Sequence, residues 1–290
     1  MYLNDKQELS VLISEIWDIK RFNGDVGIEV EVEGINLPHL NTQLWKTVAD
    51  NSLKGGKEGC EYVLRQPVSI EKLYPLLVEF KQNFKDSLVD NSIYAGIHAH
   101  INVQTLTPKQ LLTFLVSFFI LEELLVKWCG NTRVGNHFCL RSSDAEYLIH
   151  FIRNIVLDNS LKDILGNDNI RYSAANLKSL GKYGSIEFRC LNSTIDPDRI
   201  YTWCSTLINI LRMSKTFPTP DSVVMEFNRN GPEKWALKML GEHSKKFLTD
   251  GWEDDIYEGL GRAQDIAFCR EWSDKPNFNV FKKKLEMFSG

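Results

Sequence analysis

The chain has 290 residues, of which 43% are hydrophobic and 25% are charged, and its formal net charge is -4. This composition is typical of a globular protein and excludes disordered, collagen-like and coiled-coil proteins. The slight acidic excess argues against a general nucleic-acid binder, since such proteins carry a basic surface. The chain starts without a long apolar run, and its longest mainly apolar stretch, Leu111 to Leu121, is too short for a bilayer span. We therefore expect a cytoplasmic protein that contacts neither membrane nor nucleic acid.

Short segments rich in β-branched and aromatic residues, bounded by Gly, Asn, Asp or Pro, predict four strands. They are Val26 to Val32, Glu61 to Leu64, Gly96 to Val103 and Gly184 to Leu191. Between the second and third of these, the spacing of apolar residues predicts a helix from Ile70 to Phe84, which Pro75 should break or kink near its start. The pattern predicts an α+β protein with a largely antiparallel sheet.

Two further helices carry start and stop signals. Thr107 can cap a helix whose capping box is completed by Gln110, and Gly130 ends this helix. Asp196 begins another helix, which runs toward Lys215. The rest of the chain has a helical pattern with aromatic anchors, which predicts a packing or lid appendage without chemistry of its own.

The first predicted strand places three acidic residues on one face, because side chains two apart on a strand point to the same side. Glu29, Glu31 and Glu33 alternate there with apolar residues. Adjacent carboxylates repel each other, so this face is either exposed to solvent or part of a site that binds cations. Glu33 lies farther along the strand, and we interpret it as a solvated residue or as a residue that contacts the metal ligands rather than the metal.

The third and fourth predicted strands repeat this arrangement. His98, His100 and Asn102 share one face of the third strand, and Glu187 and Arg189 share one face of the fourth. Each motif alone also fits a solvated histidine pair or a surface ion pair. If the strands lie in one antiparallel sheet, their polar faces form a concave ligand-binding wall, with helices packed on the other face.

The residue types on this wall indicate metal and phosphate chemistry. Carboxylates with imidazole suit Mg²⁺ or Mn²⁺ better than zinc, because no thiolate is within reach. The fork of Arg189 matches phosphate or carboxylate oxygens, so a metal together with this arginine indicates a nucleotide phosphate. Arg133 and Arg141, in a loop-like stretch, are either surface charges or further nucleotide contacts.

Several other motifs are absent from the sequence. There is no Walker loop, no dinucleotide fingerprint and no G-x-S-x-G elbow, so a phosphate would be held by cations rather than by a backbone cradle. The cysteines include no C-x-x-C pair, and we expect them to be free thiols in a reducing compartment. They are Cys60, Cys129, Cys139, Cys190, Cys204 and Cys269.

The order of these motifs resembles that of the glutamine synthetase-like carboxylate-amine ligase superfamily, and most closely its small amidoligase branch, which is often phage-encoded. The shared motifs are a G-x-E-x-E strand, a D-G-S segment followed by a lone Glu, an H-x-H strand, an R-Y-x-x-x-N segment and an E-F-R strand. Here they stand at Gly27 to Glu31, Asp50 to Ser52 with Glu61, His98 to His100, Arg171 and Tyr172 with Asn176, and Glu187 to Arg189. The chain departs from the family pattern at Asn51, which replaces Gly, and at Leu64 to Pro67, which replace a Pro-rich turn.

The resemblance implies a fold like the glutamine synthetase catalytic domain for residues 1–215, with residues 216–290 as a helical extension packed on the same domain. It assigns the divalent metals to Glu29, Glu31, Glu61, His98 and Glu187. Contacts with ATP are assigned to His100, Asn176, Arg171 and Arg189, and catalytic roles to Glu187, Arg171 and Arg189, of which Arg189 meets the transferred phosphoryl group. A buried ion pair is the alternative interpretation of Arg171.

The activity implied by the resemblance is formation of an amide or isopeptide bond through an acyl phosphate, with ATP and Mg²⁺ or Mn²⁺ as cofactors. The partners would be ATP, a small-molecule, peptide or protein carboxylate, and an amine, while the oligomeric state is left open. Asp50 and Glu58 are guesses for the base that deprotonates the amine. Two alternatives remain at this point: a metal-dependent hydrolase that uses the His and Glu residues without ATP, and a non-catalytic phage-type binding or assembly protein with the same fold.

Overall fold

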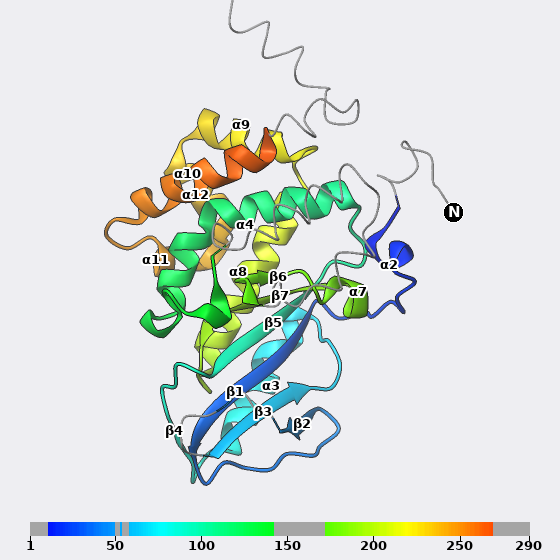
Figure 1. Cartoon of the computed structure of the whole chain (residues 1–290), viewed down its shortest axis with the longest axis vertical. Coiled ribbons are helices and arrows are strands. Elements are labelled where there is room, and N and C mark those ends of the chain that lie inside the picture. The colour runs from blue at the N-terminus through cyan, green and yellow to red at the C-terminus, as the bar shows by residue number, and fades with distance from the viewer. Residues whose placement is uncertain (1–10, 50–52, 54–57, 142–171, 269–290) are drawn as a thin grey trace, which may run out of the picture.

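The computed structural model describes residues 11–49, 53, 58–141 and 172–268. In these residues an antiparallel sheet lies beside a group of helices (Figure 1), which confirms the predicted α+β class. The strands are β1 (Val26–Ile35), β2 (Trp45–Val48), β3 (Glu58–Leu64), β4 (Leu88–Val89), β5 (Gly96–Asn102), β6 (Ala175–Asn176) and β7 (Ser185–Asn192). Their order across the sheet is β2-β3-β1-β5-β7-β6, and β4 pairs with the end of β1. The four predicted strands thus lie next to one another as β3, β1, β5 and β7.

The helices begin and end close to their sequence signals. They are α2 (Ile13–Ile16), α3 (Ile70–Gln82), α4 (Pro108–Cys129), α7 (Leu180–Tyr183), α8 (Pro197–Ser214), α9 (Pro220–Asn230), α10 (Pro232–Leu240), α11 (Ser244–Phe247) and α12 (Trp252–Ala267), with 3-10 turns η1 (Asn131–Arg133), η2 (His137–Cys139) and η5 (Gly241–His243). Thr107 and Gln110 form the predicted capping box of α4, since each side chain accepts a hydrogen bond from the other's backbone N–H. Pro75 does not break α3, because its position in the second turn removes only one backbone hydrogen bond.

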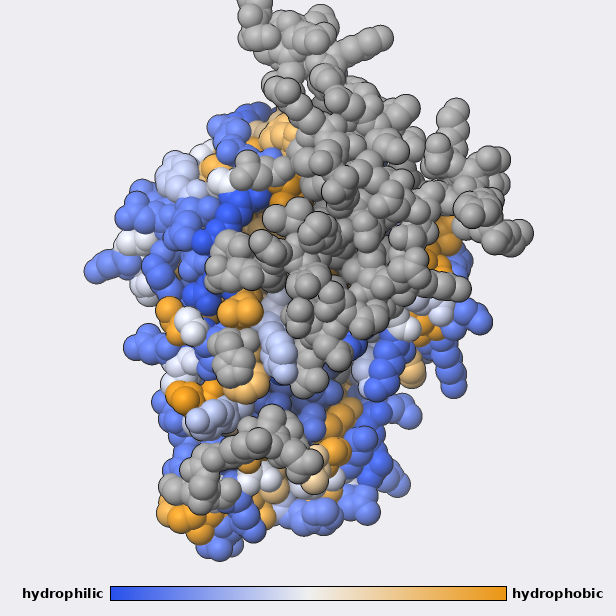
Figure 2. Space-filling model, viewed as in Figure 1, coloured by the Kyte–Doolittle hydropathy of each residue, from blue (hydrophilic) through white to orange (hydrophobic). Residues whose placement is uncertain are grey.

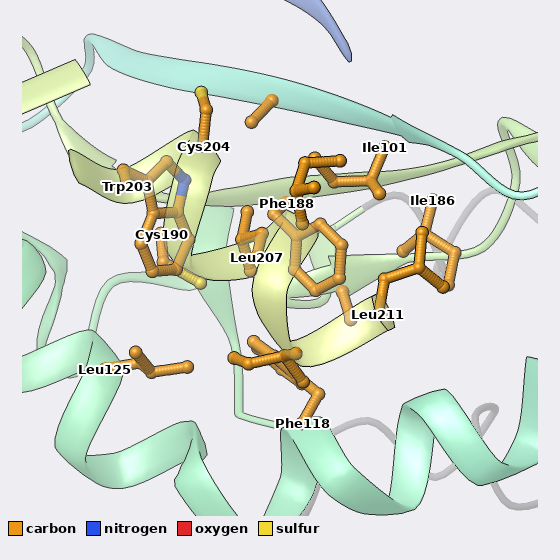
Figure 3. Close-up of a cluster of buried hydrophobic side chains, with 14 of the residues drawn as sticks. Ile101, Phe118, Leu125, Ile186, Phe188, Cys190, Trp203, Cys204, Leu207 and Leu211 are labelled. Atoms are coloured by element: carbon orange, nitrogen blue, oxygen red, sulfur yellow. The ribbon is translucent and has the colours of Figure 1, made fainter. Parts of the chain in front are cut away.

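One face of the sheet is apolar and packs against helices α3, α4 and α8. Ile28 and Val30 of β1 and Ile101 of β5 are buried on this face. Phe188 of β7 contacts Phe118 of α4, with ring centroids 4.8 Å apart, and Figure 3 shows the surrounding apolar side chains from β5, β7, α4 and α8. Alternation along the strands therefore leaves the opposite face to the polar residues.

Of the helices after α8, α9, α11 and α12 pack on α4 (Figure 1), and α12 runs closely along it, while α10 packs on α8 and α9. Gly259 permits this approach, because a Cβ atom there would lie 2.5 Å from the backbone oxygens of Phe119 and Ile120. In the view of Figure 2, hydrophilic residues dominate the described surface and apolar residues are scattered among them. None of the described helices is long and apolar enough to cross a bilayer.

A short parallel bridge joins the two chain segments that lie beside β6 and β7. The Leu140 N–H donates to the Tyr172 carbonyl (2.8 Å), and the Ala174 N–H donates to the Leu140 carbonyl (2.7 Å). The bridge holds the end of η2 next to β6. The described cysteines, those at 60, 129, 139, 190 and 204, are free thiols as predicted, and Cys269 lies outside the described residues.

Candidate active site

The register of the sheet brings the predicted polar residues into two adjoining rows. Glu29 of β1 lies opposite His98 of β5, and His100 of β5 lies opposite Glu187 of β7. Glu31 follows Glu29 on the same face of β1. Three strands that are far apart in the sequence thus contribute to one group of side chains. We call Glu29, Glu31, His98, His100, Glu187 and Arg189 the sheet cluster.

The imidazoles of the sheet cluster lie between its carboxylates. His98 Nδ1 is 3.2 Å from Glu29 Oε2 and 3.4 Å from Glu187 Oε1, and its Nε2 is 3.5 Å from Glu31 Oε2. His100 Nε2 is 3.4 Å from Glu29 Oε1. The His98 and Glu187 side chains are only 4% and 9% exposed, while Glu29 is 25% exposed. The cluster is therefore largely shielded from water, with Glu29 at its accessible side.

Arg189 reaches the cluster from a bulge in β7. Ile97 pairs with Leu191 but Ala99 pairs with Phe188, so two residues of β7 lie opposite the single residue between Ile97 and Ala99. The Arg189 guanidinium donates to Glu187 Oε1 through Nη1 and to the Phe138 carbonyl through Nε (3.3 Å). These bonds hold a guanidinium beside the Glu187 carboxylate.

The contacts within the cluster shift several pKa values. Burial alone would raise the pKa of the Glu29 carboxyl, but the neighbouring His100 and His98 outweigh burial and lower it. Burial would also raise the pKa of the Glu187 carboxyl, but the charges of Arg189 and of the two histidines outweigh burial and lower it. For His100, burial lowers the pKa, while Glu29 and Glu187 raise it to a net value above the ordinary one. Both carboxylates are consequently ionised at neutral pH.

The donor atoms fit a divalent cation. One donor atom from each of Glu29, His100 and Glu187 lies within 4.8 Å of the other two. The Nε2 atoms of His98 and His100 are buried and have no hydrogen-bond partner among the described residues. Two carboxylates and an imidazole with an unused nitrogen form a donor set that Mg²⁺ or Mn²⁺ accepts.

Of this compact group, Glu29 and Glu187 were predicted metal ligands, whereas His100 was predicted to contact ATP. The remaining predicted metal ligands lie beside the group. Glu31 accepts a hydrogen bond from the Gly96 N–H (3.0 Å) and lies opposite Glu61 of β3. Asn176 of β6, predicted to contact ATP, donates to Glu187 Oε2 (2.7 Å). Arg171, together with Asp50, Asn51 and Ser52, lies outside the described residues.

The structure corrects some interpretations of single residues. Glu33 is buried rather than solvated. Glu58 is exposed, and alternation along β3 puts it on the face opposite Glu61, so it is not a base within the sheet cluster. Arg133 and Arg141 are buried rather than surface charges: Arg133 donates to the Arg189 carbonyl (2.6 Å), and Arg141 donates to Glu123 (3.0 Å).

A cavity beside the cluster contains residues that the sequence did not single out. It has a volume of about 290 Å³ and is lined by Glu29 and His100 together with Phe22, Lys46, Arg65 and Tyr183. Lys46 lies on β2, a strand of four residues that the sequence pattern did not predict. No sequence signal pointed to Lys46, because its place near Glu29 follows from the register: Val63 of β3 pairs with both residues.

The chain was compared with protein families, with curated proteins and with solved structures. The family model described as "putative amidoligase enzyme" matches residues 63–211. The matched residues include His98, His100, Glu187 and Arg189 and begin after β1. Among curated proteins and among solved structures, nothing matches the chain.

Proposed function

Because the chain belongs to the family of putative amidoligase enzymes, we propose that it is an ATP-dependent carboxylate-amine ligase whose active site is the sheet cluster. The observation that supports this proposal is the convergence of Glu29, His98, His100, Glu187 and Arg189 within hydrogen-bonding or ion-pair distance on one face of the sheet. Two imidazoles, carboxylates and a guanidinium supply the groups that bind a metal-nucleotide complex.

Glu29, His100 and Glu187 would hold the Mg²⁺ or Mn²⁺ ion, with His98 and Glu31 beside them. When bound, the ion neutralises phosphate charge. Ser185 would orient His100, because its Oγ lies 3.3 Å from His100 Nδ1. If His100 Nδ1–H donates to Ser185 Oγ, Nε2 carries the lone pair and can bind a cation shared with Glu29.

In the proposed reaction, an oxygen of the substrate carboxylate attacks the γ-phosphorus of ATP. The bond from that phosphorus to the bridging oxygen breaks, which gives an acyl phosphate and ADP. The amine nitrogen then attacks the acyl carbon, the C–O bond to phosphate breaks, and the nitrogen loses a proton. Such a reaction requires positioning and electrostatic stabilisation more than a nucleophilic side chain.

Arg189 would stabilise the phosphoryl group during its transfer. Its guanidinium is fixed by the Glu187 carboxylate and the Phe138 carbonyl, so it is already oriented before a ligand binds. A preoriented fork matches the oxygens of a transferring phosphoryl group better than a mobile point charge does.

The proposal is tested by incubating the protein with Mg²⁺, ATP and pools of carboxylates and amines, followed by mass spectrometry and measurement of phosphate. We expect phosphate release and a product of added mass only when ATP, a carboxylate and an amine are all present. Cleavage of pool components without ATP would instead identify a metal-dependent hydrolase. The variant Glu187→Gln serves as the inactive control.

A further inference from the structure

The cavity beside the sheet cluster extends the polar face toward the edge of the sheet. Lys46, Val63 and Glu29 lie in one row across β2, β3 and β1, so Lys46 is two strands away from Glu29. Arg65 follows directly after β3, and it lines the same cavity. A ligand that contacts Glu29 or His100 at one end can therefore reach two cations at the other.

The charges that line this cavity favour an anion. Glu29 is its single lining carboxylate within the described part of the chain, and the two imidazoles already face this carboxylate. Neither Lys46 nor Arg65 forms an ion pair with a described residue. Lys182 is not a lining residue, but its Nζ lies 4.6 Å from the ring centroid of the lining residue Tyr183 and adds a third positive charge nearby.

Arg65 is held in place before any ligand binds. Its Nε donates to the Thr42 carbonyl (2.8 Å), and its Nη2 donates to the side chain of Asn41. Both partners lie in the turn before β2, and neither is charged. A guanidinium fixed by neutral acceptors loses little side-chain freedom on binding and keeps its charge for an incoming anion.

Gly27 leaves room in the lining of the cavity. A Cβ atom on Gly27 would meet only the Cβ of His100, at 3.5 Å, so the position is open on the cavity side. Phe22 and Tyr183 supply aromatic surface to the same space, and each is about 40% exposed. The cavity thus combines a fixed guanidinium and a lysine with apolar ring surface, as small-ligand sites do.

We propose that Lys46 and Arg65 form a subsite for an anionic oxygen group of a substrate, a carboxylate or a phosphate, whose apolar part contacts Phe22 or Tyr183. This inference adds a substrate-binding region to the proposed active site. It rests on the proposed function for the identity of the molecule that carries the anion. The anion is then either a phosphate of the nucleotide or a second acidic group on the carboxylate substrate, remote from the reacting carboxylate.

The test measures anion binding without metal or turnover. Protein stripped of metal ions on a chelating resin is titrated by calorimetry with tripolyphosphate and, separately, with citrate. Lys46→Gln and Arg65→Gln are each expected to weaken at least one probe by about tenfold, because each removes a charge-assisted contact. A selective loss of tripolyphosphate binding identifies a nucleotide phosphate, and a selective loss of citrate binding identifies an acidic substrate.

The matched control is Lys72→Gln, an exposed charge change on α3, away from the cavity. Unchanged affinity for both probes in both cavity variants, or an equal loss in Lys72→Gln, would overturn the subsite. Gly27→Val adds a test without a charge change, and we expect it to weaken the same probe by filling the cavity. If the variants lose anion binding but no ligase activity is found, the proposed function fails and the subsite stands; if ligation is found and binding is unchanged, only the subsite fails.

Discussion

The protein contains two groups of charged residues that differ in how completely their polar atoms are paired. In the helices, Glu123 of α4 accepts hydrogen bonds from Arg141 (3.0 Å) and from Arg262 of α12 (2.8 Å), and Arg262 also donates to Glu258 (2.6 Å). We call these four residues the helix cluster. Glu123 is buried and Glu258 is exposed, and Arg262 also lies 4.0 Å from the buried Glu122. Each of these carboxylates therefore lies within ion-pair distance of a guanidinium.

The sheet cluster is arranged differently. Arg189 pairs directly with Glu187, while the Nε2 atoms of His98 and His100 lack hydrogen bonds to described residues. A cavity opens beside the sheet cluster. The comparison teaches that burial of charge alone does not mark a functional site; buried ligand atoms without hydrogen bonds, next to a cavity, do.

The largest contrast between the clusters is expected for metal binding in Glu187→Gln. This change removes a ligand charge at nearly constant shape, and the amide oxygen can still accept from Asn176. We expect Mn²⁺ affinity to fall by about a hundredfold or more, because even residues that only hydrogen-bond to metal ligands contribute up to that factor. Calorimetry with Mn²⁺ measures this change, with Glu123→Gln as the control in the helix cluster. Equal Mn²⁺ affinity in wild type and Glu187→Gln would remove the metal site from the sheet cluster.

A smaller effect is expected from Ser185→Ala, which tests the orientation of His100. Loss of the hydroxyl leaves His100 Nδ1 without its partner, so the Nε2 lone pair is less firmly directed at the cation. We expect Mn²⁺ affinity to fall by about tenfold, while the conservative Ser185→Thr, which keeps the hydroxyl, retains most of it. If alanine and threonine behave alike, Ser185 does not position the imidazole.

Arg189→Lys separates transition-state stabilisation from nucleotide binding. Lysine keeps the positive charge but loses the planar fork, so we expect kcat to fall by about tenfold while the affinity for the metal-ATP complex changes less. Steady-state kinetics together with nucleotide titration distinguish the two quantities. Equal losses in both would place Arg189 in ground-state binding.

The smallest expected effect concerns the stability of the helix cluster. Burial would raise the pKa of Glu123, but the bonds from Arg262 and Arg141 outweigh burial and lower it. A lowered folded-state pKa stabilises the fold above the ordinary carboxyl pKa, and this contribution disappears as the pH falls through the folded-state value. Glu123→Gln should therefore unfold more easily by about 1 kcal/mol at pH 7, with the difference shrinking below about pH 4.

Urea unfolding of wild type and Glu123→Gln between pH 3 and pH 7 measures this difference. Metal affinity at pH 7 should be the same in both proteins, because the helix cluster lies outside the candidate site. A difference in unfolding free energy that stays constant over this pH range would show that the Glu123 charge does not contribute to stability.

The polar and apolar faces of β1, β5 and β7 could be predicted because strand alternation is a local property of the backbone. The pairing of Glu29 with His98 and of His100 with Glu187 could not be predicted from the residues alone, since register depends on contacts between distant segments. The motif order supplied by the family resemblance compensated for this gap.

The cavity residues could not be predicted for a similar reason. Lys46 lies on a strand too short to show alternation, and Arg65 lies just beyond a strand end. The burial of Arg133 was also hidden, because an arginine in a loop-like stretch is ordinarily exposed. Its burial depends on Gly96, where a Cβ atom would lie 3.1 Å from the guanidinium. Close contacts of this kind between distant segments leave no periodic pattern in the sequence.

The bridge at Leu140 ties two described segments to each other by their main chains. Leu140 bonds to both Tyr172 and Ala174, and the chain runs on from there into β6. Because backbone groups make these bonds, any residue except proline at position 140 can donate and accept them. The place of Asn176 beside Glu187 therefore does not require the leucine side chain.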